Sequence, residues 1–269
     1  MKTKHLSSQV FAVLLLAGGW FVGDSFAQSA TPSAPVSRTE MESVIKDYLL
    51  KNPIVVQEAL QALQKQEADR KAGQALAALK SNRAALYQDS AAPVLGNPRG
   101  DVTIVEFFDF RCGYCRQVDA SVAELIAADP NVRVVLKQFP VLGAESIYGA
   151  KAAMAAHRQG KYREFHKALM AAETIDATSV RAIAKQLQLD AQRLVSDMDL
   201  ADVTKTIDDN YKLAAELEVN GTPAFVIGNR IVPGAVNAAA LIAMVQVERT
   251  SGANGVSSAQ GSEIPTARK

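Results

Sequence analysis

Apolar residues follow three different patterns along this chain of 269 residues. Residues 10–22 form a nearly continuous apolar run, residues 38–90 carry apolar positions at helical spacing, and residues 102–140 contain two apolar stretches typical of buried strands. These patterns predict an N-terminal targeting segment, a helical arm and an α/β domain, in that order.

The first apolar run has the flanks of an export signal. It follows a short basic N-terminus and precedes the small residues of a cleavage site, Ser25-Phe26-Ala27. We therefore predict a signal peptide over residues 1–27 and a periplasmic protein. A membrane anchor is the weaker alternative, because the run is shorter than the ~20 residues needed to span a bilayer. The Ser/Pro/Ala-rich residues 28–37 are expected to form a flexible leader.

The arm is predicted over residues 38–90. Thr39 and Glu42 have the spacing of a capping box, and Asn52-Pro53 is expected to start a second helix. The apolar stripe is interrupted by the polar residues 64–71. A single stripe of this kind cannot form a core alone, so the arm either folds back on its own domain or forms an oligomerisation stalk with other copies. The pattern leaves both alternatives open.

The α/β domain is predicted over residues 91–250. A Pro/Gly/Asn-rich loop at 90–101 is followed by strand, helix and strand. The elements expected after them are a helical insertion at about 146–218, a hairpin at 223–234 and a closing helix at 235–249. The Gly/Ser-rich residues 251–269 are expected to be a disordered tail.

The net charge of the chain bears on the kind of partner it can bind. Without residues 1–27 the chain carries equal numbers of basic and acidic residues. This balance argues against a nucleic-acid partner recognised by bulk charge.

The only two cysteines, Cys112 and Cys115, lie three positions apart where the first strand gives way to a helix. The free N–H groups and positive end of that helix stabilise a thiolate at Cys112, and Cys115 is one turn away. A structural disulfide across so short a loop would remove little chain entropy. A zinc site lacks ligands, because only His157 and His166 remain after the signal peptide. We therefore predict a redox-active pair.

The strand–CGYC–helix unit, the helical insertion and Gly221-Thr222-Pro223 before the hairpin together resemble the DsbA family of exported thiol-disulfide oxidoreductases. The N-terminal helices, VEFFDFRCGYC and VNGTPAFVIG are similar to its ScsC and Com1-like branch. The resemblance implies an α/β thioredoxin fold with a long helical insertion, preceded by an N-terminal α-helical arm. It also implies that Cys112 is an exposed nucleophile, Cys115 a buried resolving thiol and Pro223 a cis-proline.

Supporting residues follow from the same resemblance. Glu106 matches a buried acidic residue that assists proton movement at the resolving thiol, and Lys137 is predicted as its ion-pair partner, with a plain strand-end charge pair as the alternative. Gly113-Tyr114 between the cysteines and Thr222 before Pro223 resemble isomerases such as DsbC more than strongly oxidising members.

The resulting expectation is a disulfide isomerase and reductase that acts on disulfide-containing exported proteins. It is expected to need no cofactor, to be kept reduced by a DsbD-like membrane thiol reductase, and to form a homo-oligomer, with a trimer favoured. Two alternatives stay open. One is a DsbA-like dithiol oxidase, and the other is a copper-tolerance protein that holds Cu(I) on Cys112 and Cys115.

Overall fold

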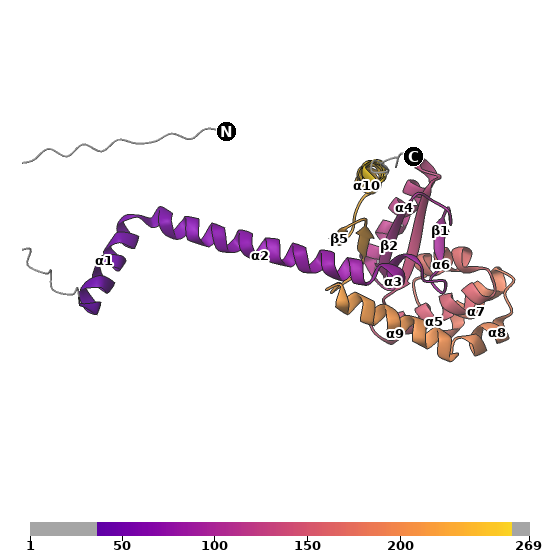
Figure 1. Cartoon of the computed structure of the whole chain (residues 1–269). Helices are drawn as coiled ribbons and strands as arrows, with labels where there is room; N and C mark the ends of the chain where they lie inside the picture. The colour runs from indigo at the N-terminus through magenta and orange to yellow at the C-terminus, as the bar shows by residue number, and fades with distance from the viewer. Residues whose placement is uncertain (1–36, 260–269) are drawn as a thin grey trace, which may run out of the picture. The chain divides into compact units, whose positions relative to one another are not determined.

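The computed structural model describes residues 37–259 (Figure 1). The predicted signal peptide, the leader up to residue 36 and residues 260–269 lie outside the described residues. Two compact units are separated after Leu60. No helix in the described part of the chain is long and apolar enough to cross a membrane.

The first unit contains helix α1 (Arg38–Lys51) and the start of α2 (Pro53–Ser81). Helix α2 begins at Pro53, as predicted, but α1 is capped by Ser37 and Glu40 instead of Thr39 and Glu42. Both pairs have the capping-box spacing. The observed choice leaves Glu42 free to accept from Arg38 Nε at 2.9 Å, one helical turn earlier.

Apolar side chains of the first unit have no core to enter. None of the residues of α1 is buried, and the four at positions of one stripe are more than half exposed. These are Met41 (53%), Val44 (65%), Ile45 (52%) and Tyr48 (55%). A stripe of this kind on an isolated helix is normally covered by another surface.

The second unit is built on a five-stranded sheet in the order β1-β3-β2-β4-β5. The strands are β1 (Val94–Gly96), β2 (Val102–Phe108), β3 (Val132–Gln138), β4 (Ala224–Ile227) and β5 (Arg230–Pro233). Strands β2 and β3 are parallel and the other pairs are antiparallel. The two predicted buried strands and the hairpin are present, whereas β1 lies inside the segment predicted as a loop. Its three residues form a strand because they pair with β3.

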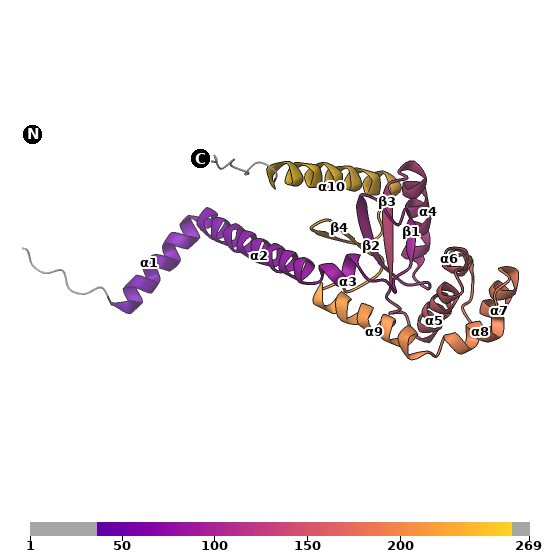
Figure 2. The same cartoon turned by 45° about the vertical axis from the view of Figure 1, so that its right-hand side comes forward.

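Ten helices are described along the chain, and those of the second unit include α3 (Arg83–Tyr87), α4 (Gly113–Ala128) and α10 (Ala238–Ala259). The insertion consists of α5 (Ala144–Arg158), α6 (Tyr162–Ala171), α7 (Ala177–Gln186), α8 (Ala191–Asp197) and α9 (Ala201–Glu216). Helix α10 packs on α4 and contacts β2 and β4, as Figure 2 shows from a second side. Helices α3 and α9 contact β2 and β3 respectively.

Helix α10 continues past residue 250, into the segment expected to be a disordered tail. The hydroxyls of Thr250 and Ser251 donate to the backbone carbonyl of Val247 at 2.9 and 2.8 Å. Ser and Thr therefore bond to the preceding helical turn here instead of ending it. The expected tail begins too early at residue 251.

The predicted boundary at residue 90 also differs from the structure. Leu79 and Leu86 are 4% and 0% exposed and belong to the core cluster that contains Val105 and Phe107 of β2. The second unit therefore starts at Gln61 and includes most of α2. The reason is that the last apolar positions of the predicted arm pack under the sheet, where the sequence pattern alone showed only a continuing stripe.

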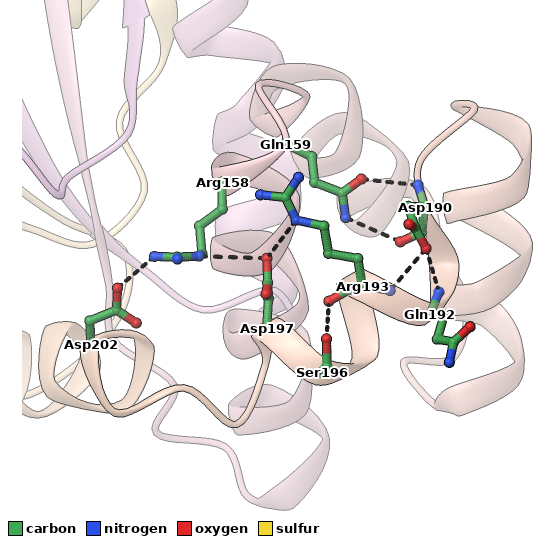
Figure 3. Close-up of polar contacts among 8 residues, drawn as sticks. All are labelled: Arg158, Gln159, Asp190, Gln192, Arg193, Ser196, Asp197 and Asp202. Atoms are coloured by element: carbon green, nitrogen blue, oxygen red, sulfur yellow. Dashed lines mark hydrogen bonds and ion pairs between the residues drawn. The ribbon is translucent and has the colours of Figure 1, made fainter.

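A polar network ties the insertion helices together (Figure 3). The Asp197 carboxylate at the end of α8 lies 3.5 Å from Arg158 Nε of α5 and 3.4 Å from Arg193 Nε. Arg158 also binds Asp202 of α9 at 2.5 Å. Nearby, Asp190 caps α8 by accepting from two backbone N–H groups. The network thus joins α5, α8 and α9.

We expect Asp197→Ala to lower the free energy of unfolding by about 1–2 kcal/mol, because it removes the carboxylate shared by two guanidinium groups. Asp199→Ala is the matched control, since the Asp199 side chain is 84% exposed in its ion pair. That change should cost less than about 0.5 kcal/mol. Urea denaturation of both variants measures the difference, and equal costs would contradict a stabilising role for Asp197.

Candidate active site

Cys112 and Cys115 lie at the point where the chain leaves β2 and enters α4. Cys112 is the N-cap residue of α4, so its side chain sits at the positive end of the helix. Cys115 follows one turn later on the buried face of the same helix, and both are free thiols. The sequence prediction of a thiol pair at a strand-to-helix junction is therefore confirmed.

The segment before β4 closes over the first cysteine. Cys112 Sγ lies 3.3 Å from the backbone carbonyl oxygen of Thr222 and donates to it. The Thr222–Pro223 peptide bond is cis, as the resemblance implies. Cys112 is only 7% exposed, so the implied exposed nucleophile is largely covered in the structure. Tyr114 between the cysteines is 66% exposed.

A groove of about 770 Å³ lies beside the same segment. It is lined by Lys71 and Ala75 of α2, by Thr222 and Pro223, and by Ile231 of β5 among others. The carbonyl of Pro223 accepts from the N–H of Gly234 at 2.8 Å, which fixes the segment against the end of β5. The groove therefore borders the Thr222–Pro223 segment, whose first residue contacts Cys112.

Cys115 is fully buried at 0% exposure. Burial raises the pKa of its thiol, and the nearby Cys112 and Glu106 act in the same direction. A backbone hydrogen bond with Asp109 opposes this shift but does not cancel it. The thiol form of Cys115 is therefore strongly favoured, so any reaction that uses its thiolate must give the proton to another group.

Glu106 is a buried carboxyl group close enough to Cys115 for its charge to raise the pKa of that thiol. It lies in β2, is 4% exposed, and its ordinary pKa of 4.5 is raised to about 8, first by burial and then by the charge of Asp119. A carboxyl group with a pKa near 8 exchanges protons at neutral to mildly alkaline pH.

The predicted ion pair between Glu106 and Lys137 is wrong. In the parallel pairing of β2 with β3, Glu106 is opposite Leu136 and Phe107 is opposite Lys137. Paired residues point to the same face and successive residues to opposite faces, so Glu106 and Lys137 lie on opposite sides of the sheet. Lys137, 1% exposed, binds Asp89 at 2.5 Å, and burial lowers the pKa of its ammonium group.

A family model described as a DSBA-like thioredoxin domain matches residues 103–246, which is more than half of the chain. The chain belongs to the DSBA-like thioredoxin domain family. A second model, described as the copper resistance protein ScsC N-terminal domain, matches residues 38–70 of this DsbA-like chain. The predicted thioredoxin-type fold and the resemblance to ScsC are both confirmed.

Two solved structures are similar over most of their own length. A thioredoxin-like oxidoreductase from Silicibacter pomeroyi is 47% identical with a TM-score of 0.61, and the match covers 63% of this chain and 98% of that one. Proteus mirabilis ScsC in a transitional conformation is 30% identical with a TM-score of 0.60, over 79% and 97% of the two chains.

The chain spans only about a quarter of the length of a curated relative that it matches. Na⁺/H⁺ antiporter NhaA 3 from Salinispora tropica is 31% identical over 168 residues. The match covers 56% of the DsbA-like chain but only 24% of the antiporter.

Sequence reasoning missed several polar residues around the cysteines of this DsbA-like domain. Asp109, 1% exposed, accepts from the backbone N–H groups of Arg111 at 2.7 Å and Leu142 at 3.0 Å, and so joins the CGYC loop to the loop before α5. Asp119 of α4 and His166 of α6 lie 3.0 Å apart and form a second pair. The spacing of Asp119, four residues after Cys115, was the available signal, whereas its partner is 47 residues away.

The raised pKa of Glu106 predicts a pH-dependent gain from its removal. Between pH 4.5 and about 8 the folded chain keeps a proton on Glu106 that the unfolded chain releases, so this group makes the fold less stable as pH rises. Glu106→Gln should therefore gain stability relative to the parent, on the order of 3 kcal/mol more at pH 9 than at pH 5.

Denaturant unfolding at the two pH values measures this gain. Glu124→Gln, an exposed change on α4, is the control and should behave alike at both. A Glu106→Gln difference that is the same at pH 5 and pH 9 would contradict the raised pKa.

Proposed function

We propose that this chain is an exported thiol-disulfide oxidoreductase that works as a disulfide isomerase and reductase on periplasmic proteins. The observation that carries the proposal is the contact of Cys112 Sγ with the Thr222 carbonyl at 3.3 Å, with Cys115 one turn behind it. A substrate disulfide bound along the Thr222–Pro223 segment would meet the Cys112 sulfur at the N-terminus of α4.

The proposed reaction has two steps. The Cys112 thiolate attacks one sulfur of a substrate disulfide, forms a mixed disulfide and releases the other sulfur as a thiolate. Cys115 then attacks the Cys112 sulfur, its proton passes to Glu106, and the substrate leaves reduced. Alternatively, another thiol of the substrate attacks the mixed disulfide, which rearranges the substrate and returns Cys112 to its starting form.

The residues around the cysteines support the reducing and isomerising direction over the oxidising alternative. Gly113-Tyr114 lies between the two cysteines, and Thr222, whose carbonyl contacts Cys112 Sγ, precedes Pro223; both resemble isomerases such as DsbC. Burial raises the pKa of the Cys115 thiol, so the reduced pair gains no stabilisation from a Cys115 thiolate, in contrast to a strong oxidant, whose reduced form is stabilised. We propose that a DsbD-like membrane thiol reductase restores this reduced state after each reduction.

The arm supports an oligomeric isomerase. The exposed stripe of α1 lies within the residues matched by the ScsC N-terminal model, 38–70. We propose that copies of this stripe cover one another, with a trimer favoured, so that several cysteine pairs act on one misfolded client.

Copper handling is the second candidate, favoured by the description of that N-terminal model. The matched residues contain no cysteine or histidine, and the described part of the chain holds no cluster of three or more His, Cys, Asp or Glu side chains suited to a metal. The thiolates of Cys112 and Cys115 are soft ligands that suit Cu(I), so this pair is the candidate copper site. Titration of the reduced chain with Cu(I) tests this candidate, which requires stoichiometric binding.

Reduction of insulin by glutathione tests the proposed function. The mature chain should accelerate the precipitation of the insulin B chain and should rearrange scrambled disulfides in the same buffer. Thr222→Val should shift the balance toward oxidation of a dithiol peptide. A chain that oxidises the peptide well but neither reduces insulin nor rearranges disulfides would establish the oxidase alternative instead.

A further inference from the structure

A network of buried and partly buried polar side chains joins β3, α6 and α4. Gln138 Nε2 donates to the hydroxyl of Tyr162 at 2.9 Å, and this hydroxyl lies 3.5 Å from His166 Nδ1. His166 Nε2 lies 3.0 Å from Asp119 Oδ1. Polar groups so deeply buried are normally retained only when each finds a partner.

The hydrogen-bond donors of this network all point toward Asp119. Since the Tyr162 oxygen accepts from Gln138, its own O–H is free to donate to His166 Nδ1. His166 then carries its proton on Nε2 and donates it to the Asp119 carboxylate. This assignment of protons satisfies every contact and directs the dipoles toward a negative charge on Asp119.

His166 is buried among aromatic rings. It is 4% exposed, and its ring meets those of Phe108 and Phe110 edge-on at centroid distances of 5.2 and 5.3 Å. The side chain of Asp119, in contrast, is 28% exposed. Asp119 therefore connects the buried cluster with solvent.

Asp119 is also related to Cys115 and to Glu106. It follows Cys115 by one helical turn on α4, so both side chains lie on the same side of that helix. Its charge raises the pKa of Glu106, second only to burial.

The other groups that face Glu106 are few. Besides Asp119, Cys115 of α4 and Tyr162 of α6 lie close enough to Glu106 for its charge to act on them. Its neighbours on β3 and β4, Leu136 and Phe225, are apolar. Lys137 is on the opposite face, so no lysine or arginine among the described residues lowers the pKa of Glu106 against the effect of Asp119.

We propose that the Asp119–His166 pair positions a fixed negative charge beside Glu106 and thereby governs proton transfer from the Cys115 thiol to Glu106 when the active-site disulfide closes. In that step the S–H bond of Cys115 breaks and its proton passes to the Glu106 carboxylate. The Cys115 sulfur forms a bond with Cys112, and the bond from Cys112 to the substrate sulfur breaks. The substrate leaves as a thiolate, so the two cysteines are oxidised and the substrate is reduced.

His166 and Asp119 are positioning residues in this account, because neither touches a reacting sulfur. The inference rests on the proposed role of Glu106 as the proton acceptor. The two ideas are nevertheless separable, since changes at Glu106 test the acceptor and changes at Asp119 or His166 test the pair.

The experiment follows closure of the disulfide directly. Reduced mature chain reacts with excess oxidised glutathione at pH values between 5 and 9. Each reaction is quenched with acid, the free thiols are alkylated, and the masses of the products are measured by mass spectrometry. The fraction trapped as a glutathione mixed disulfide reports how slowly Cys115 closes the bond. The parent should close it faster as pH rises, with a midpoint that follows the ionisation of Glu106.

Asp119→Asn removes the neighbouring charge and should move this midpoint down by roughly one pH unit. His166→Phe should do the same, because Asp119 loses its donor and turns to solvent. His166→Gln retains an N–H donor and should restore the parent midpoint. Glu124→Gln on the exposed side of α4 removes an equal charge and should leave the midpoint unchanged.

Two outcomes separate the hypotheses. If Glu106→Gln leaves the pH profile as it was, the proton acceptor is misassigned and the inference falls with it. If Glu106→Gln removes the transition while Asp119→Asn and His166→Phe keep the parent midpoint, the pair alone is rejected. Asp119→Asn is a partly exposed, isosteric change, so the test does not depend on whether His166→Phe folds.

Discussion

Cys112→Ser is expected to abolish thiol–disulfide exchange, leaving only the uncatalysed background, whereas Cys115→Ser is expected to trap the enzyme on its substrate. A serine hydroxyl in place of the Cys112 thiol is not ionised near pH 7 and cannot attack a disulfide. When serine replaces the resolving thiol of Cys115, the first step still occurs but the mixed disulfide has no intramolecular partner.

Insulin reduction and mass spectrometry of the quenched reaction measure these two results. Circular dichroism provides the control for folding, because Cys115 is fully buried and its replacement adds a hydroxyl to the core. Trapping by Cys112→Ser with turnover by Cys115→Ser would reverse the assignment of the two thiols.

Ile45→Asp combined with Tyr48→Asp is expected to convert the proposed oligomer into a monomer. Both side chains are more than half exposed in the described chain, and they lie on the same stripe of α1 as Val44. Placing two carboxylates where copies of the stripe would meet forces buried like charges on one another, which costs several kcal/mol per interface. Sedimentation equilibrium of the mature chain measures the change in mass.

The matched control is Lys46→Asp, on the opposite side of α1. It changes charge on the same helix without entering the stripe, so the oligomer should persist. A parent chain that sediments as a monomer, or a double variant that retains the parent mass, would contradict the proposed stalk.

Local sequence signals were sufficient for the thiol site. The CGYC motif directly follows a β-branched and aromatic run, so the strand, the loop and the start of α4 are specified within about 20 residues. The hairpin around Gly228 is similarly local, because Gly228 adopts a positive φ of 58° in the turn between β4 and β5. The family resemblance supplied the cis peptide at Pro223, which residue preferences alone do not predict.

Long-range pairing explains what the sequence did not predict. The partner of Lys137 depends on which residue of β2 it faces, and a shift of one position sends a side chain to the opposite side of the sheet. Asp89, its actual partner, lies 48 residues earlier in the chain. The Asp119–His166 pair joins α4 to α6 across 47 residues, and no periodic pattern in the sequence predicts it.

The arm boundary shows the same limitation. An apolar stripe on a helix indicates that the helix packs against something, but it does not identify the surface. Leu79 and Leu86 lie in the core of the second unit, whereas the apolar residues of α1 are not buried. A truncation at residue 90 would therefore remove core side chains together with Asp89, which compensates the buried Lys137.

We propose above all that an oligomer held by the arm makes this DsbA-like chain an isomerase, and reactivation of ribonuclease with scrambled disulfides tests this most directly. The mature chain and its Ile45→Asp/Tyr48→Asp variant are compared at equal concentrations of active-site thiol, with insulin reduction as the control for the cysteines. The parent should reactivate ribonuclease, and the variant should lose most of this activity while reducing insulin at the parent rate. Equal reactivation by both, or none by either, would contradict the proposal.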